Sequence, residues 1–375
     1  MDFTISAILY GSGITIILYA IYLIVQAISF IRYKPKPITK KYQPFVSVII
    51  PVRNEEKNIQ SCLLSVASQT YPAHLYEILL VNDSSEDQTV AIAQSLGIAN
   101  LRILSADGNT KYAYKKAAIT QAISESKGEI ILTTDGDCIV PVDWIAGMIS
   151  QFSEKTAMVA GPVKLTGSNL IQQMQSLEFC GLQIVGAGSI ARNSPTMANG
   201  ASLAYRKSDF LAVDGFRNVD QIASGDDELL MHKLFAAGLE VRFAALPEVI
   251  VETKACENWN SFRNQRIRWV SKSTVYQNQW ITLTLMNAYL ANLSFLILLV
   301  LILIKPSVWH CLPGLFCIKW LGELTVLIPA TRFFGNQALL KWFIPEQILH
   351  IFYVIWVGIA GNITKTYSWK GREVQ

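Results

Sequence analysis

Long apolar segments lie near both ends of the chain, and the charged residues concentrate between them. Residues 3–31 carry no charge and are long enough to cross a hydrocarbon core of about 30 Å as a helix. Residues 280–364 contain about three further hydrophobic segments of comparable length. The pattern therefore predicts an N-terminal transmembrane helix, a water-exposed block over residues 42–271 and a C-terminal membrane region.

The middle hydrophobic segment of the C-terminal region, residues 308–330, contains two charges. Lys319 and Glu323 are four residues apart, so they can pair on one face of a helix. Charged residues inside a bilayer are costly and mark functional sites in many membrane proteins. The competing interpretation, an interfacial or re-entrant segment, is the one we expect here.

Basic residues after the first hydrophobic segment indicate its orientation. They are Arg32, Lys34, Lys36, Lys40 and Lys41. The positive-inside rule then puts the N-terminus outside and the polar block in the cytosol, as in an integral protein of the cell (inner) membrane. The tail is also basic, which favours a cytosolic C-terminus, whereas four full spans would place it outside. The sequence leaves this conflict open.

The polar block alternates between short apolar runs and amphipathic stretches. The runs predict strands over residues 46–51, 77–81, 101–104 and 129–134, and the stretches predict helices over residues 55–68, 86–96 and 114–125. This alternation predicts an α/β fold with a mostly parallel sheet and helices on both faces. Ligands of such sheets bind beyond the carboxyl ends of the strands.

Polar residues stand at those predicted strand ends. Arg53 and Glu55 follow the first strand, Asp83 follows the second, and Asp135 and Asp137 follow a later one. We expect them to line one rim of the sheet. Because both usual glycine-rich phosphate loops are missing from the sequence, an anionic ligand would be held through carboxylates and a divalent cation. Hard cations such as Mg²⁺ or Mn²⁺ take these oxygen ligands.

Two later motifs each have a structural and a functional interpretation. Asp226 and Asp227 precede an amphipathic stretch and suit the N-cap of a helix. A cap needs only one of them, which leaves the other free to act as a general base. Residues 265–269, Gln-Arg-Ile-Arg-Trp, are typical of a basic interfacial helix with a membrane-surface tryptophan.

Composition narrows the function classes. Of 375 residues, 51% are hydrophobic and 16% are charged, which is low for a soluble domain. The formal net charge of +4 is too small to indicate nucleic-acid binding but suits a protein that contacts anionic membrane lipids. The six cysteines form no C-x-x-C pair, and we expect reduced thiols.

Five motifs occur together in a recognisable order. They are Pro51–Glu56 (PVRNEE), Val81–Asp87 (VNDSSED), Asp135–Asp137 (DGD), Gly225–Asp227 (GDD) and Gln265–Trp269 (QRIRW). Together they resemble the membrane-bound family 2 glycosyltransferases of GT-A fold, the branch with cellulose, chitin and hyaluronan synthases and ceramide glucosyltransferase. The resemblance covers roughly residues 44–272.

The resemblance implies roles for residues on the donor side. A nucleotide-sugar donor, with a UDP-sugar expected, would be bound by Pro51, Arg53, Glu55, Asp83, Lys116 and Asp135. Asp137, together with Asp135, would hold Mg²⁺ or Mn²⁺. Lys116 enters because residues 115–118 resemble the lysine-rich donor loop of the family.

On the acceptor side, the resemblance makes Asp227 the catalytic base. The acceptor or the diphosphate would contact Asp226, Gln265, Arg268 and Trp269. The expected activity is an inverting, metal-dependent transfer of sugar to a hydroxyl of a lipid-linked or glycan acceptor at the membrane.

Other activities were weighed against this one. A processive polysaccharide synthase is the main alternative, although known ones have more membrane helices, which a homo-oligomer could supply. A metal-dependent phosphoesterase or nuclease would need more metal ligands, often histidines, near the acidic rim. A membrane transporter or scaffold without catalysis is a distant third, because no inverted repeat is visible.

Overall fold

The computed structural model describes residues 3–39, 41–106, 114–222, 224–272, 276, 278–363, 367–369 and 372–374. The chain packs into two compact units. The helical unit comprises Met1–Arg32, Gly167–Gly188 and Cys256–Tyr367, and the sheet unit comprises Tyr33–Thr166, Ser189–Ala255 and Ser368–Gln375. The helical unit thus includes residues 167–188 and 256–271, which the hydrophobic pattern alone grouped with the polar block. The domain ranges drawn from the sequence stay a prediction.

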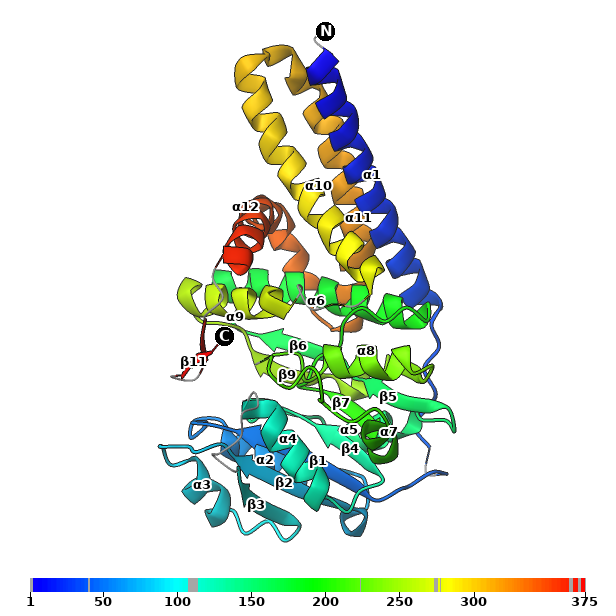
Figure 1. The fold of residues 1–375 in the computed structure, drawn as a ribbon, viewed down its shortest axis with the longest axis vertical. Helices are drawn as coiled ribbons and strands as arrows, with labels where there is room; N and C mark the ends of the chain where they lie inside the picture. The colour runs from blue at the N-terminus through cyan, green and yellow to red at the C-terminus, as the bar shows by residue number, and fades with distance from the viewer. Residues whose placement is uncertain are drawn as a thin grey trace. The chain divides into compact units, whose positions relative to one another are not determined.

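The sheet unit is built on a seven-stranded sheet of order β3-β2-β1-β4-β7-β5-β8. Its strands are β1 (Val46–Val52), β2 (Tyr76–Asn82), β3 (Leu101–Ser105), β4 (Ile130–Thr133), β5 (Thr156–Ala160), β7 (Leu203–Arg206) and β8 (Glu240–Phe243). Only β7 runs antiparallel to its neighbours among these strands. Helices flank the sheet (Figure 1), so the predicted mostly parallel α/β fold is confirmed.

The remaining elements of the sheet unit are short. Its helices are α2 (Ile59–Ala67), α3 (Thr89–Ser95), α4 (Tyr114–Glu125), α5 (Trp144–Ser150), α7 (Lys207–Ala212) and α8 (Glu228–Ala236), with 3₁₀ turns at Ala73–Leu75 and Pro247–Val249. Strands β6 (Val163–Thr166) and β9 (Val251–Lys254) form a second, two-stranded sheet, and β10 (Tyr367–Trp369) pairs with β11 (Arg372–Val374). The central strands are apolar and fully buried, which fits a sheet covered on both faces.

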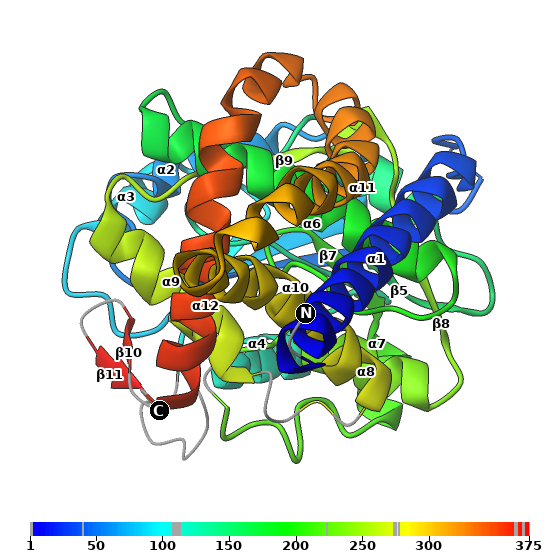
Figure 2. The same cartoon turned by 90° about the horizontal axis from the view of Figure 1, so that it is seen from above.

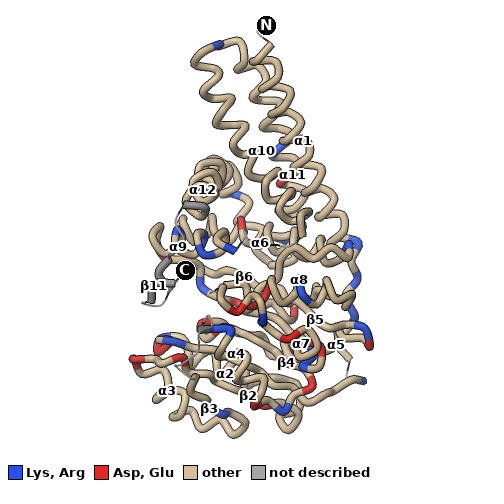
Figure 3. Tube along the Cα trace, viewed as in Figure 1, with Lys and Arg blue, Asp and Glu red and all other residues tan. Residues whose placement is uncertain are grey.

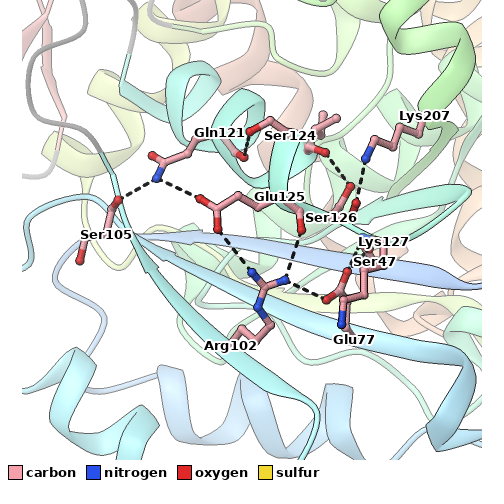
Figure 4. A network of polar contacts seen from close by, with 11 residues as sticks. Ser47, Glu77, Arg102, Ser105, Gln121, Ser124, Glu125, Ser126, Lys127 and Lys207 are labelled. Atoms are coloured by element: carbon pink, nitrogen blue, oxygen red, sulfur yellow. Dashed lines mark hydrogen bonds and ion pairs between the residues drawn. The ribbon is translucent and has the colours of Figure 1, made fainter.

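A polar network fastens the amino ends of the first three strands (Figure 4). The carboxylate of Glu77, on β2, accepts hydrogen bonds from Ser47 Oγ of β1 at 2.7 Å and from the main chain of Lys127 at 2.6 Å. Its other oxygen lies 3.2 Å from Arg102 of β3, which also contacts Glu125 at the end of α4. This network lies at the edge opposite the carboxyl ends, so it supports the sheet without occupying the rim.

The helical unit contains α1 (Phe3–Arg32), α10 (Gln279–Ile304), α11 (Leu312–Phe333), α12 (Phe343–Ile363), α9 (Trp259–Ser271) and most of α6 (Leu170–Ala191), with 3₁₀ turns at Pro306–Cys311 and Gln337–Trp342. Four segments are long and apolar enough to cross a membrane: Phe3–Arg32, Gln279–Ile304, Pro306–Phe333 and Gln337–Gly361. Figure 3 shows almost no charge along α1, α10 and α11.

The long helices do not all run the same way. Helix α1 packs along α10 and α11, whereas α12 lies across them: Figure 1 views it nearly end-on and Figure 2 shows its length. Four of the exposed apolar side chains of α12 recur every four residues, at Ile344, Ile348, Phe352 and Trp356, and Leu349 and Ile359 are exposed as well. Residues at this spacing share one face of a helix.

The two charges within α11 form a buried pair, as their spacing predicts. Lys319 Nζ lies 2.6 Å from Glu323 Oε1 and 2.5 Å from Gln347 Oε1 of α12. Tyr19 of α1 donates its hydroxyl to Glu323 at 3.2 Å. Helix α11 runs unbroken along α1, so the expected re-entrant course is not what the structure shows. The charges are tolerated because they face helices rather than lipid.

Close packing of α1 against α11 depends on Gly322. A Cβ atom at this position would lie 2.8 Å from both Cα and Cβ of Ala20, closer than such atoms pack. We expect Gly322→Ala to separate the two helices and to lower the free energy of unfolding by about 1–3 kcal/mol. Thermal unfolding in detergent measures the loss.

Gly314→Ala is the matched control, because Gly314 lies in the same helix with nothing within 4 Å of its added Cβ. Both substitutions replace glycine by alanine, which has the higher helix propensity. The difference between the thermal midpoints of the two variants therefore reports the contact between α1 and α11 at Gly322. Equal midpoints would contradict the close approach of α1 and α11.

Candidate active site

One ammonium group joins two acidic motifs at the carboxyl ends of the strands. Lys115 Nζ, in the first turn of α4, lies 2.8 Å from Asp135 Oδ1 and 2.9 Å from Asp226 Oδ2. Burial lowers the pKa of Lys115, but the two carboxylates outweigh it and hold the pKa above its ordinary value. The lysine therefore stays charged and connects the segment after β4 with the segment before α8.

Asp135 and Asp137 lie together with a thiol in a group that could hold a metal ion. One ligand atom each from Asp135, Asp137 and Cys138 falls within 4.8 Å of the others. Two carboxylates suit Mg²⁺ or Mn²⁺, so the donor set fits the expected cation. Burial, followed by the charges of Asp137 and Asp135, raises the pKa of Cys138, and the thiol stays protonated.

Two glycines allow these segments to approach closely. A Cβ at Gly136, between the two aspartates, would lie 2.6 Å from Val52 Cγ1 at the end of β1. A Cβ at Gly200 would lie 3.0 Å from Asp226 Oδ2 and 3.1 Å from Lys115 Nζ. The ends of β1 and β4 and the segment before α8 thus converge, as the strand-end rule predicts.

Asp227 is the N-cap of α8. Its Oδ1 accepts a hydrogen bond from the main chain of Glu228 at 2.7 Å, and its Oδ2 accepts one from the main chain of Gly200 at 2.9 Å. The capping residue of the acidic pair is therefore Asp227, while Asp226 contacts Lys115. Two main-chain donors hold the Asp227 carboxylate in one orientation at the positive end of a helix.

Lys116, expected on the donor side, contacts main-chain carbonyls. Its side chain is only 1% exposed, and Nζ donates to the oxygens of Val219, Ile222 and Ser224 at 2.7, 2.9 and 2.8 Å. These carbonyls belong to the segment that leads into Gly225 and the acidic pair. Lys115, and not Lys116, therefore contacts Asp135. Lys116 instead orders the main chain of the segment that leads to Asp226.

The residues predicted around the first two strands also cluster, with distinct contacts. The Arg53 guanidinium, which is buried, donates to the carbonyl oxygens of Asp83 and Ser84 and pairs with Glu86 at 2.8 Å. It thereby orders the loop that presents Asp83. Glu55 is buried and accepts a hydrogen bond from Asn58 at 2.9 Å.

Pro51 is half-buried near the end of β1 and is paired with Val81 of β2, so it lies beside the segment of Asp83. The structure therefore brings Pro51, Arg53, Glu55 and Asp83 to the same rim as Asp135. Their assignment to a nucleotide stays a prediction.

The remaining predicted residues, Gln265, Arg268 and Trp269, lie on α9 of the helical unit. The indole of Trp269 packs against Phe179 of α6, with ring centroids 6.0 Å apart.

Sequence reasoning missed three residues of the site. Lys115 and Gly200 each stand in a segment that resembles one of the family, residues 115–118 on the donor side and residues 199–201 on the acceptor side, but neither was assigned a role, and Cys138 was counted only among the reduced thiols. Adjacent helical residues point about 100° apart, so the choice between Lys115 and Lys116 depends on how α4 is rotated. The position of Cys138 directly after Asp137 was the one feature of the sequence that could have pointed to a thiol beside the metal ligands.

Comparison with known proteins identifies the family. The family model for glycosyl transferase family 21 matches residues 12–375. Glycosyltransferase AglE of Haloferax volcanii is 43% identical over 129 residues, which cover 34% of this chain and 41% of AglE. A dolichyl N-acetyl-alpha-D-glucosaminyl phosphate 3-beta-D-2,3-diacetamido-2,3-dideoxy-beta-D-glucuronosyltransferase of Methanococcus voltae is 24% identical over 212 residues, which cover 53% of this chain and 60% of that protein. The chain spans less than two thirds of the length of such curated relatives.

A solved structure shares the fold over nearly the whole chain. The mannosyltransferase PcManGT from Pyrobaculum calidifontis, solved in complex with GDP-Man and Mn²⁺, is 18% identical and superposes with a TM-score of 0.62, over 96% of this chain and 98% of that one. The resemblance of the motifs to glycosyltransferases is confirmed, while their placement in family 2 stays a prediction. Because the family model covers nearly all of the chain, the protein belongs to glycosyl transferase family 21.

Proposed function

We propose that this glycosyltransferase moves a sugar from a nucleotide-sugar donor to a hydroxyl of a lipid-linked or glycan acceptor at the membrane, with inversion and with a divalent metal. The observation that carries the proposal is the double contact of Lys115 with Asp135 and Asp226. It unites the acidic motif expected to bind the donor with the acidic pair expected to receive the acceptor.

The donor side follows from the arrangement of charges. Asp135 and Asp137 would hold Mg²⁺ or Mn²⁺, which when bound offsets charge on the leaving diphosphate. Lys115 adds a second, permanent positive charge beside Asp135. We assign the contact with the nucleoside to Asp83, whose carbonyl accepts a hydrogen bond from Arg53, with a UDP-sugar as the expected donor. PcManGT, solved with GDP-Man and Mn²⁺, supports both the donor class and the cation.

The acceptor side needs a base that removes the hydroxyl proton as the oxygen attacks the anomeric carbon. We assign this role to Asp227, which two main-chain hydrogen bonds orient, and we assign to Asp226 the contact with Lys115. A single displacement at the anomeric carbon inverts its configuration. Gln265, Arg268 and Trp269 are proposed to complete the acceptor or diphosphate side.

A first prediction tests the base. Asp227→Asn keeps the capping hydrogen bond from Glu228 but loses the one from Gly200, so the variant should fold with a somewhat lower thermal midpoint. We expect donor binding within about twofold of the wild type and a loss of turnover of roughly a hundredfold or more. Asp226→Asn is the comparison, because that residue caps nothing. Near-normal transfer by Asp227→Asn would refute the assignment.

A second prediction concerns the donor. In titration calorimetry with a nucleoside diphosphate, Asp137→Ala should abolish the part of the affinity that depends on Mn²⁺, because it removes a metal ligand. Lys115→Met should weaken binding both with and without Mn²⁺. Binding of wild-type strength by Asp137→Ala in the presence of Mn²⁺ would count against the metal site.

Lys116→Met serves as the control for the neighbouring lysine. It leaves three buried carbonyls without their donor, so it should lower the thermal midpoint while the folded fraction still binds the nucleotide. The two lysines should therefore separate into a binding phenotype and a stability phenotype.

Membrane placement completes the proposal. The relative from Methanococcus voltae bears the name of a transferase that acts on a dolichyl phosphate-linked sugar, which supports a lipid-linked acceptor. We place α1, α10 and α11 across the cell (inner) membrane and α12 along its cytosolic surface, with the sheet unit in the cytosol. In this arrangement the apolar face of α12 meets lipid, and Arg32–Lys41 and the basic tail lie on the same side.

This topology predicts a cytosolic C-terminus. In a background without the exposed Cys311 and Cys317, a cysteine appended after Gln375 should resist a membrane-impermeant maleimide in intact cells and react once the membrane is opened. One appended before Met1 should react in intact cells. Labelling of the C-terminal cysteine from outside would require α12 to be a fourth span.

A further inference from the structure

A buried carboxylate in the helical unit joins three helices. Glu178 of α6 accepts from Arg266 Nη2 of α9 at 2.5 Å, and the side chains are 10% and 4% exposed. The other oxygen of Glu178 accepts a hydrogen bond from the hydroxyl group of Tyr353, on α12. Gln175, one turn earlier on α6, makes two hydrogen bonds to the main chain of Cys256, just before α9 begins. Helix α9 is therefore held at its entry and at its middle.

Aromatic rings enclose the guanidinium on α9 itself. Arg266 lies 4.7 Å from the ring centroid of Phe262 and 4.3 Å from that of Trp269. Phe262 in turn meets Tyr353 edge-on at 5.4 Å. Positions 262, 266 and 269 share one face of a helix. We call this set, with Glu178 and Tyr353, the α9 clamp.

Helical geometry separates the clamp from the other motif residues. At 3.6 residues per turn, Gln265 and Arg268 lie about 100° and 160° around α9 from Arg266, on the same side. Trp269 lies about 60° from Arg266, and its ring rests on the guanidinium. Gln265 lies only about 40° from Trp269, at the border of the clamped face, whereas Arg268 lies on the far side of α9.

The ion pair is a poor source of stability. Burial raises the pKa of Glu178 in spite of the opposing charge of Arg266, so desolvation outweighs the attraction. Arg266 Nε and Nη1 also have no hydrogen-bond partner among the described residues. Buried pairs of this kind can often be replaced by apolar residues without loss of stability. What an apolar pair cannot reproduce is a directed contact that selects one rotation of α9.

We propose that Glu178 is a positioning residue that sets the rotation of α9 through Arg266, and that Trp269 belongs to this clamp rather than to the acceptor contacts. The clamp fixes the direction in which Gln265 and Arg268 point. The inference rests on the proposed function only in so far as Gln265 and Arg268 are taken to act on the acceptor or the diphosphate. The contacts of the clamp do not depend on it.

The decisive variant is the double substitution Glu178→Met with Arg266→Met. It removes both charges together and leaves only the Tyr353 hydroxyl without its acceptor, so the thermal midpoint should fall by a few degrees at most and the affinity for the nucleotide should be kept. Turnover should fall about 10- to 100-fold, because misplacement of a contact by about 1 Å has effects of that size. Turnover of wild-type level in the folded double variant would overturn the proposal.

A second buried pair supplies the matched control. Lys319→Met with Glu323→Met also removes a buried ion pair from the helical unit, but both residues lie on α11, and they bond to Gln347 of α12 and Tyr19 of α1. Its turnover should stay near that of the wild type. Equal losses in the two double variants would show general loosening of the helices and would reject a specific role for the clamp.

A readout without turnover separates this proposal from the proposed function. In a background without the exposed Cys311 and Cys317, Arg268→Cys reports the rotation of α9 by its rate of reaction with a polar maleimide. Adding the Glu178→Met and Arg266→Met changes should alter that rate severalfold. An unchanged rate overturns the clamp, whereas a wild-type protein that transfers no sugar overturns the proposed function and leaves the labelling result standing.

Discussion

The contact of Lys115 with two carboxylates is the interaction on which the candidate site depends. Asp135 belongs to the end of a parallel strand, whereas Asp226 precedes a helix that follows an antiparallel strand of the same sheet. Without a cation between them, these neighbouring acids, which are only partly exposed to water, would repel each other. The ammonium makes their proximity favourable, and the missing side chain of Gly200 leaves room for it. The acidic rim is thus assembled around a fixed positive charge before any ligand arrives.

The neighbouring Lys116 extends this control to the main chain. One turn of α4 sends one lysine to the carboxylates and the next to three carbonyls of the segment that leads to them. Arg53 has a similar part in the loop of Asp83, where it donates to two carbonyls. In both places a buried cation orders a loop through main-chain oxygens. Lys116 and Arg53, which the sequence predicted as ligand-binding residues, thus position the loops of the site by hydrogen bonds to main-chain oxygens.

The sequence predicted the fold more completely than the site. The periodicity of the sequence placed α4 with the same bounds as the structure. The polar residues at the strand ends predicted that Asp83, Asp135 and Asp137 share one rim, because this follows from local spacing. Spacing could not decide which of two adjacent residues faces the rim, and so Lys116 was favoured over Lys115 and the capping member of the acidic pair was left open. Those outcomes depend on helix rotation, which distant contacts set. The sequence also did not predict that α6 packs with the apolar helices, because the residues that α6 contacts are far away in sequence.

That grouping has a consequence for biosynthesis. Glu178 meets Arg266 across 88 residues and Tyr353 across 175 residues of sequence. At ribosomal speeds of 5–20 residues per second, α6 waits roughly 4–18 s for α9 and about twice as long for α12. During that interval α6 can already meet α1, where Gly188 lies close to the main chain of Gln26, but the side of α6 that contacts α9 and α12 has no partner. In the proposed membrane arrangement, the nascent protein therefore exposes this side of α6 near the bilayer surface until the last helix is made.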